Sequence, residues 1–182
     1  MNRLLWFSCL IIAVVFSGFS TGWPQSKPGA PVITGWYGVE RGMYRDSLKI
    51  YIEAEDPEGD MLRIATVVNQ YGYGYYSPDW TFLKKENQKH FKGYLQWNTT
   101  STRAPYLPEW TQIFISVSVF DKAGNESNQI VIPFMFESGV RAQYDKLPPP
   151  FDQGEVQKLG NVNIELFNPM MMGDGGGTRI VN

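Results

Sequence analysis

The sequence contains two short acidic stretches, each of which separates two segments with alternating apolar residues: Glu55-Asp56-Pro57-Glu58-Gly59-Asp60-Met61-Leu62 and Val119-Phe120-Asp121-Lys122-Ala123-Gly124-Asn125-Glu126-Ser127. Apolar residues repeat at every second position before each stretch: Leu48, Ile50, Ile52 and Ala54, then Ile113, Ile115, Val117 and Val119. A period of two places each set on one face of a half-buried strand. In the first stretch Pro57 fixes φ and Gly59 tolerates a positive φ, so the chain reverses within a few residues. The sequence therefore predicts strand, tight turn and strand at two places, a pattern typical of a β-sandwich.

Further alternating segments extend this prediction along the chain. Strands are expected at residues 32–39, 47–55, 61–69, 91–97, 112–120 and 129–136. The last two form the strongest hairpin, joined by residues 121–128. No long helical period occurs after residue 22, although residues 79–89 fit a short helical turn. The expected fold class is all-β, a single antiparallel β-sandwich over residues 32–138.

The first 22 residues have the pattern of a secretory signal peptide. Arg3 precedes an apolar stretch over residues 4–19, and the small residues Ser20 and Gly22 follow it. The apolar stretch is shorter than the roughly 20 residues of a membrane-spanning helix, so an uncleaved anchor is the competing interpretation. Cys9 is the single cysteine and lies inside this stretch, so the chain after residue 22 can form no disulfide. We expect a secreted or periplasmic protein that meets a membrane only through an uncleaved signal.

The composition changes on both sides of the expected sandwich. Residues 23–31 contain three prolines and form an extended segment ahead of the first strand. Two biased segments follow residue 138: Pro148-Pro149-Pro150 and Gly173-Asp174-Gly175-Gly176-Gly177. Consecutive prolines favour an extended chain, and a glycine-rich segment favours a flexible one. We interpret residues 139–182 as a flexible tail outside the core. Within it, residues 161–167 fit an added strand, either in this sandwich or on a partner's sheet edge, with alternating Val162, Ile164 and Leu166.

Residues 54–62 resemble the early turn of bacterial immunoglobulin-like and cadherin-like domains, in which an alanine-x-aspartate-proline-acid-glycine-aspartate-x-leucine run links two sandwich strands. Residues 117–127 are similar to the last hairpin of the same superfamily, and the two stretches stand in the expected order. The resemblance covers about residues 31–136 and implies an immunoglobulin-like sandwich. It does not select among spacers, adhesins, carbohydrate-binding accessories and assembly subunits. Because the chain lacks an internal repeat, we favour a subunit or binding module over a spacer.

The acidic side chains of the two turns are candidate metal ligands. Asp56, Glu58, Asp60 and Asp121 supply the hard oxygen atoms that calcium prefers, and the cadherin-like resemblance points the same way. The alternative is structural, because aspartate and glycine also stabilise turns through hydrogen bonds to the backbone and through positive φ. The cofactor prediction is none, with calcium at these four residues as the alternative.

An aromatic and glycine-rich stretch occupies residues 71–80. Tyr73, Tyr75, Tyr76 and Trp80 offer rigid faces on which sugar rings or a partner's apolar groups can stack. Alternatively, these rings fill the core or cover a sheet edge. They are the predicted ligand or partner face.

Charge and composition argue against nucleic-acid binding and catalysis. The chain of 182 residues has 16 basic and 18 acidic side chains, with no long basic run. His90 is the only histidine and no nucleophile motif surrounds it, which excludes a histidine-rich zinc site and argues against a catalytic triad. We expect a noncatalytic protein-binding or structural subunit of a cell-envelope or extracellular assembly. The alternative is a carbohydrate-binding module that uses residues 71–80 and has a polysaccharide as its partner.

Overall fold

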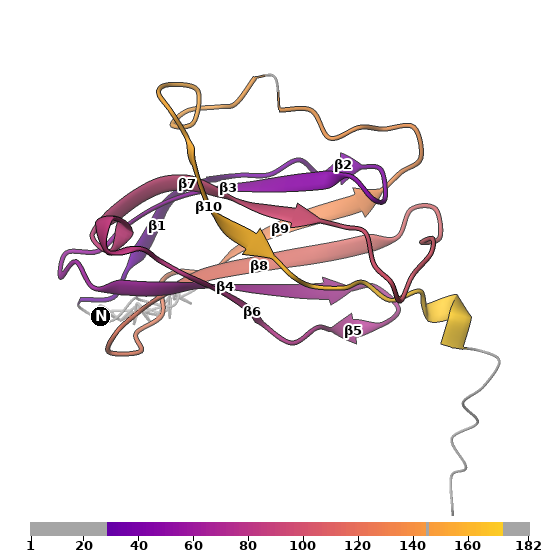
Figure 1. The fold of residues 1–182 in the computed structure, drawn as a ribbon, viewed down its shortest axis with the longest axis horizontal. Helices are drawn as coiled ribbons and strands as arrows, with labels where there is room; N and C mark the ends of the chain where they lie inside the picture. Colours follow the sequence, from indigo (N-terminus) through magenta and orange to yellow (C-terminus); the bar gives the residue numbers. More distant parts are fainter. Residues whose placement is uncertain (1–28, 145, 173–182) are drawn as a thin grey trace, which may run out of the picture.

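The computed structural model describes residues 29–144 and 146–172. The predicted signal peptide, residues 23–28 of the leading segment and the glycine-rich residues 173–182 lie outside the described residues. The described chain forms two β-sheets (Figure 1). The four-stranded sheet has the order β1 (Val32–Tyr37), β3 (Ser47–Glu55), β7 (His90–Asn98) and β10 (Gln157–Val162).

The six-stranded sheet has the order β2 (Arg41–Gly42), β9 (Ile130–Phe136), β8 (Gln112–Asp121), β4 (Met61–Gln70) and β5 (Gly74–Tyr75), and β6 (Asp79–Phe82) also pairs with β4. Two short 3₁₀ helices complete the fold, η1 (Lys85–Asn87) and η2 (Pro169–Met172). Within residues 29–144 and 146–172 there is no helix with the length and apolar character needed to span a membrane.

The all-β prediction is confirmed at the level of two sheets connected without long helices. The six expected strands are present, and residues 47–55 form a strand with the predicted bounds. Sequence reasoning missed β2, β5 and β6, which are short. The expectation of a purely antiparallel arrangement is wrong in two places, because β2 pairs parallel with β9 and β10 pairs parallel with β7. Both exceptions arise where a segment reaches its sheet from elsewhere in the chain rather than through a hairpin.

One hydrophobic core lies between the two sheets, because the alternating residues of both point toward it. Ile50 and Ile52 of β3 and Leu95 of β7 face Ile64, Val68 and Val117 of the other sheet, and all are buried. Burial of one such side chain stabilises the fold by about 1.5–3 kcal/mol. The core extends in sequence from Ile33 to Leu166. The strands expected before residue 138 therefore form only part of it, and residues after 138 contribute the rest.

The two acidic stretches form the predicted turns. Asp56 accepts hydrogen bonds from the backbone N–H groups of Glu58 (3.0 Å) and Asp60 (3.1 Å), and Gly59 has a φ of 73°. Asp121 accepts from the backbone N–H of Asn125 at 2.8 Å in the second turn. The first turn carries the chain from the four-stranded to the six-stranded sheet, whereas the second joins the antiparallel pair β8 and β9.

The segment after β9 lies across the outer face of the four-stranded sheet, where Figure 1 shows it running from β9 to β10. We call residues 137–156 the strap. Phe151 is buried, with its ring 5.6 Å from the ring of Tyr51, and the hydroxyl of Tyr144 accepts a hydrogen bond from the backbone N–H of Lys49 at 2.8 Å. Burial raises the pKa of Tyr144 to about 12, so this hydroxyl stays protonated at neutral pH. The strap is thus attached by aromatic contacts and backbone hydrogen bonds.

The chain then re-enters the core. β10 pairs with β7, and the three alternating residues of the predicted added strand, Val162, Ile164 and Leu166, are buried in this chain's own core. The indole N–H of Trp97 donates to the carbonyl of Ile164 at 2.9 Å, and the hydroxyl of Ser101 donates to the carbonyl of Leu166 at 2.8 Å. Of the two alternatives for residues 161–167, the structure has the one in which they join this sandwich, and the interpretation as a tail outside the core is wrong for Phe151 and for these three buried residues. The sequence gives no sign that the strap is attached, because its prolines and polar residues show no alternation of apolar positions. It is held instead by single residues such as Tyr144 and Phe151.

Candidate functional site

The carboxylates predicted as calcium ligands lie at one end of the molecule and differ in their surroundings. Asp56 and Asp121 are buried and already accept hydrogen bonds from their own turns. Glu58 is exposed. The buried oxygen Oδ1 of Asp60 has no hydrogen-bond partner among the described residues.

Burial raises the pKa of Asp60 above its usual value, and the hydrogen bond with Asp56 and the charges of Asp121, Asp56 and Glu58 add to this increase. In the part of the chain that the structure describes, no three or more histidine, cysteine, aspartate or glutamate side chains are arranged to hold a metal ion. Asp56 and Asp121 therefore have a structural role, since their carboxylates accept backbone hydrogen bonds within the turns. Calcium binding at these four positions remains a prediction.

The four predicted aromatic residues do not form one platform. Tyr76 is partly buried, and its hydroxyl accepts a hydrogen bond from the backbone N–H of Phe167 at 2.7 Å. Tyr73 stacks on Tyr76 and Phe167, with ring centroids 4.9 and 5.4 Å apart. Tyr75 is 74% exposed at the end of β5. Trp80 lies on β6 and belongs to a different surface.

Trp80 is part of an apolar surface on the outer face of the six-stranded sheet. Strand register places the outward residues next to one another: Ala65 pairs with both Trp80 and Ser118, and Arg63 pairs with both Phe82 and Phe120. Farther across the sheet, Ser116 pairs with Val131 and Phe114 with Pro133. We call this surface the open face and define it by the following outward residues: Arg63, Ala65, Val67, Trp80, Phe82, Phe114, Ser116, Ser118, Phe120, Val131, Pro133 and Met135.

Large apolar side chains on the open face are accessible to solvent. Phe82 is 64% exposed, Val131 47%, Phe114 40% and Trp80 37%. Contiguous exposed apolar surface is uncommon on monomeric proteins and typically marks an interaction site. The outer face of the four-stranded sheet is different, because the strap covers it. Among the described residues, the strap covers the outer face of the four-stranded sheet, whereas large apolar side chains on the outer face of the six-stranded sheet stay exposed.

Arg63 is the one charged residue at the outward positions of β4, β6, β8 and β9. Its guanidinium carbon lies 4.0 Å from the ring centroid of Trp80 and 5.8 Å from that of Phe120. Its buried Nε has no hydrogen-bond partner among the described residues. Stacking on aromatic faces stabilises the cation but gives Nε no hydrogen-bond acceptor. This arrangement is suited to an acceptor that arrives with a bound molecule.

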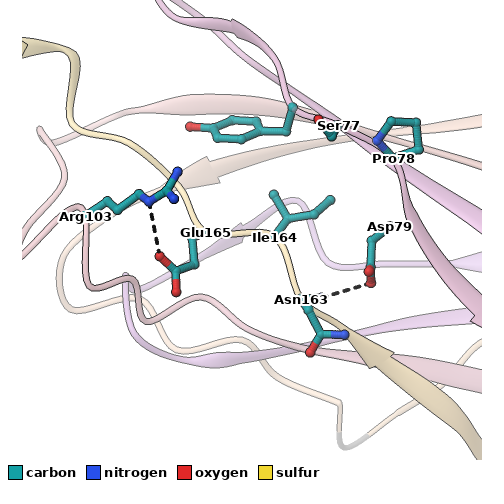
Figure 2. Close-up of a pocket in the computed structure, with 8 residues that line it drawn as sticks. Ser77, Pro78, Asp79, Arg103, Asn163, Ile164 and Glu165 are labelled. Atoms are coloured by element: carbon teal, nitrogen blue, oxygen red, sulfur yellow. Dashed lines mark hydrogen bonds and ion pairs between the residues drawn. The ribbon is translucent and has the colours of Figure 1, made fainter.

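A second surface feature is an open hollow between the start of β6 and the segment after β10, with a volume of about 420 Å³. Figure 2 shows the residues that line it. Six of its residues carry polar groups, and the other two are Pro78 and Ile164. The polar ones come from three separate parts of the chain: Tyr76, Ser77 and Asp79, then Arg103, then Asn163 and Glu165.

Two polar pairs stand at opposite ends of the hollow, with Ile164 between them (Figure 2). Arg103 Nε lies 3.7 Å from Glu165 Oε2, which also accepts a hydrogen bond from the hydroxyl of Thr102 at 3.0 Å. Asp79 Oδ2 accepts from the backbone N–H of Asn163 at 2.9 Å. Burial raises the pKa of Tyr76 to about 12, so its hydroxyl is neutral at physiological pH.

Of the residues in these two surfaces, sequence reasoning found Tyr76 and Trp80 as aromatic candidates and Ile164 as part of the predicted partner strand. A signal for the open face is present in the segment Ile130-Val131-Ile132-Pro133-Phe134-Met135-Phe136, which is apolar at both alternating sets of positions. Such a strand is apolar on both of its faces. No local signal connects Arg103 with Asn163 and Glu165, which only the path of the C-terminal segment brings together. A comparison with models of protein families finds no match, and a comparison with curated proteins finds no similar sequence.

Proposed function

We propose that this chain is a noncatalytic, secreted or periplasmic immunoglobulin-like β-sandwich that binds another protein through the open face, as a subunit of a cell-envelope or extracellular assembly. The observation that carries the proposal is the contrast between the two outer sheet faces, one covered by the strap and the other apolar and exposed. Burying exposed aromatic side chains is a main source of affinity in protein interfaces.

The strand order supports the immunoglobulin-like assignment. In immunoglobulin domains the first, second and fifth strands share one sheet, and the third, sixth and seventh share the other. Here β1, β3 and β7 are neighbours in one sheet, and β4, β8 and β9 are neighbours in the other. β10 takes the place beside β7, and the short β2 pairs parallel with β9. The resemblance of the two turns points to the same class.

Arg63 favours a different protein over a second copy of this chain. Two copies that met face to face about this residue would bring two guanidinium groups together without an acceptor for either. A partner that presents a carboxylate within an apolar surface satisfies the guanidinium and covers the aromatic rings at the same time. The expected partner is therefore a protein with an acidic side chain surrounded by apolar residues.

The test begins with tagged protein lacking residues 1–22, used to capture partners from envelope and culture-medium fractions, with capture measured by quantitative mass spectrometry. Two variants place a charge on the open face, Phe82→Glu and Val131→Glu, and Arg63→Gln removes its charge. Tyr106→Glu is the matched control, because Tyr106 is 58% exposed and lies outside the open face. Circular dichroism checks that each variant remains folded.

The proposal predicts a partner whose capture falls at least about tenfold in the three open-face variants and is unchanged in the control. Reconstitution with that purified partner should show the same order of affinities. Capture that is equal in all variants would place the contact elsewhere on the molecule. A complex made only of this chain would replace the proposed partner with a second copy.

A further inference from the structure

We propose that the hollow between β6 and the segment after β10 is a binding site for a neutral carbohydrate, separate from the open face. It is bounded by Tyr76, Asp79, Arg103, Asn163 and Glu165. Its volume of about 420 Å³ lies within the range of about 300–1,000 Å³ typical of small-molecule sites.

The chemistry of the hollow matches a ligand rich in hydroxyl groups. The carboxylates of Asp79 and Glu165 accept hydrogen bonds, the guanidinium of Arg103 donates them, and the carboxamide of Asn163 does both. A sugar hydroxyl is both a donor and an acceptor, so it can pair with each of these groups. The ring of Tyr76 offers an apolar surface to the C–H groups of a sugar ring.

Charge favours a neutral sugar over an anion. The side chains that line the hollow comprise two carboxylates and one guanidinium, so their formal charge is negative. A phosphate or carboxylate ligand would meet this negative charge with only one cation to offset it. An apolar peptide side chain is also a poor fit. It would remove these polar groups from water and offer no hydrogen bonds in place of those that water makes.

The walls of the hollow are held in place before any ligand arrives. The hydroxyl of Tyr76 accepts from the backbone N–H of Phe167 (2.7 Å), Asp79 from that of Asn163 (2.9 Å), and the side chain of Gln70 donates to the carbonyl of Phe167 (2.8 Å). These bonds attach the C-terminal segment to the chain around β5 and β6. A preorganised site loses less entropy on binding, which benefits a weakly bound ligand such as a sugar.

Donors remain in the hollow for a ligand. Within the described residues, the terminal nitrogens of Arg103 and the carboxamide of Asn163 make no hydrogen bond, and Arg103 reaches Glu165 only through Nε. The side chains of Arg103 and Glu165 are 66% and 46% exposed, so this ion pair contributes little to folding stability. Both residues can therefore be replaced without loss of the fold.

The experiment applies protein lacking residues 1–22 to an array of neutral oligosaccharides built from glucose, xylose, mannose, galactose and N-acetylglucosamine. Titration calorimetry then measures the affinity for any sugar that binds. The test variants are Arg103→Ala and Glu165→Gln. The matched control is Arg41→Ala, which removes an arginine from another exposed ion pair with a glutamate, Arg41–Glu137, outside the hollow.

We expect at least one oligosaccharide to bind, with an affinity about tenfold or more lower in Arg103→Ala and Glu165→Gln and unchanged in Arg41→Ala. Amide NMR shifts on binding should concentrate on residues 76, 77 and 79 and on residues 163–165. Absence of binding across the array overturns the proposal. So does binding that the two hollow variants leave unchanged, or a preference for inorganic phosphate over every neutral sugar.

Discussion

Asp60 is a carboxyl group whose ionisation opposes the fold. Burial, a hydrogen bond with Asp56 and the neighbouring carboxylates raise its pKa above the ordinary value of 3.8. A carboxyl group whose pKa is higher in the folded state stabilises the protein below its unfolded pKa and loses that contribution as the pH rises through the folded pKa. At neutral pH the ionised Asp60 is therefore unfavourable in the folded chain.

We expect Asp60→Asn to raise the melting temperature at pH 7, because the substitution removes a negative charge from a group of three aspartates. The gain should disappear near pH 3, where Asp60 is protonated in both states. Thermal unfolding at the two pH values tests this, with the exposed Glu86→Gln as a control expected to change little. If calcium instead stabilises the wild-type protein and not the Asp60→Asn variant, the carboxylates hold a metal and the charge argument fails.

At the scale of elements, the C-terminal segment completes the sandwich. β10 supplies the fourth strand of one sheet, and the residues after it place Ile164 and Leu166 in the core. Gly93 of β7 permits this approach, since a side chain there would meet the backbone carbonyl of Gln157 at 2.7 Å. A partner cannot use Val162, Ile164 and Leu166 as a free strand without removing them from this core.

Leu166→Ala is expected to destabilise the protein by about 2–5 kcal/mol, because Leu166 is fully buried and its truncation leaves a cavity. Lys158→Ala, at an exposed position of β10, should change stability by no more than about 0.5 kcal/mol. Urea unfolding measures both. A cost below about 1 kcal/mol for Leu166→Ala would mean that the segment contributes little to the core.

At the scale of the whole molecule, the core, strap and C-terminal segment form one packing unit. Core residues run from Ile33 to Leu166, and the strap connects β9 to β10 across the four-stranded sheet. A unit with a single shared core is expected to unfold in one cooperative transition.

We therefore expect urea unfolding curves from far-ultraviolet circular dichroism and from aromatic near-ultraviolet circular dichroism to coincide. The near-ultraviolet signal includes the ring cluster in which Tyr144 and Phe151 of the strap contact Tyr51, together with Tyr37 and Tyr94. Hydrogen exchange of the Lys49 amide, which is bonded to Tyr144, provides a local check. An earlier aromatic transition would show that the strap detaches while the sheets remain folded.

The sequence alone determined the elements with strong local signals. Alternating apolar residues and the Asp-Pro-Glu-Gly turn specify β3, β4, β8 and β9 within one or two residues, because periodicity and turn chemistry act between near neighbours in the chain. The tertiary structure alone decided what covers each sheet. It places Phe151 on Tyr51 and Arg103 beside Glu165, although the members of each pair are far apart in the sequence. It also places Leu166 in the core of this chain. Burial and ion pairing depend on which surfaces meet, so the hollow appears only after the chain has folded, whereas the apolar residues of β9 already signal part of the open face.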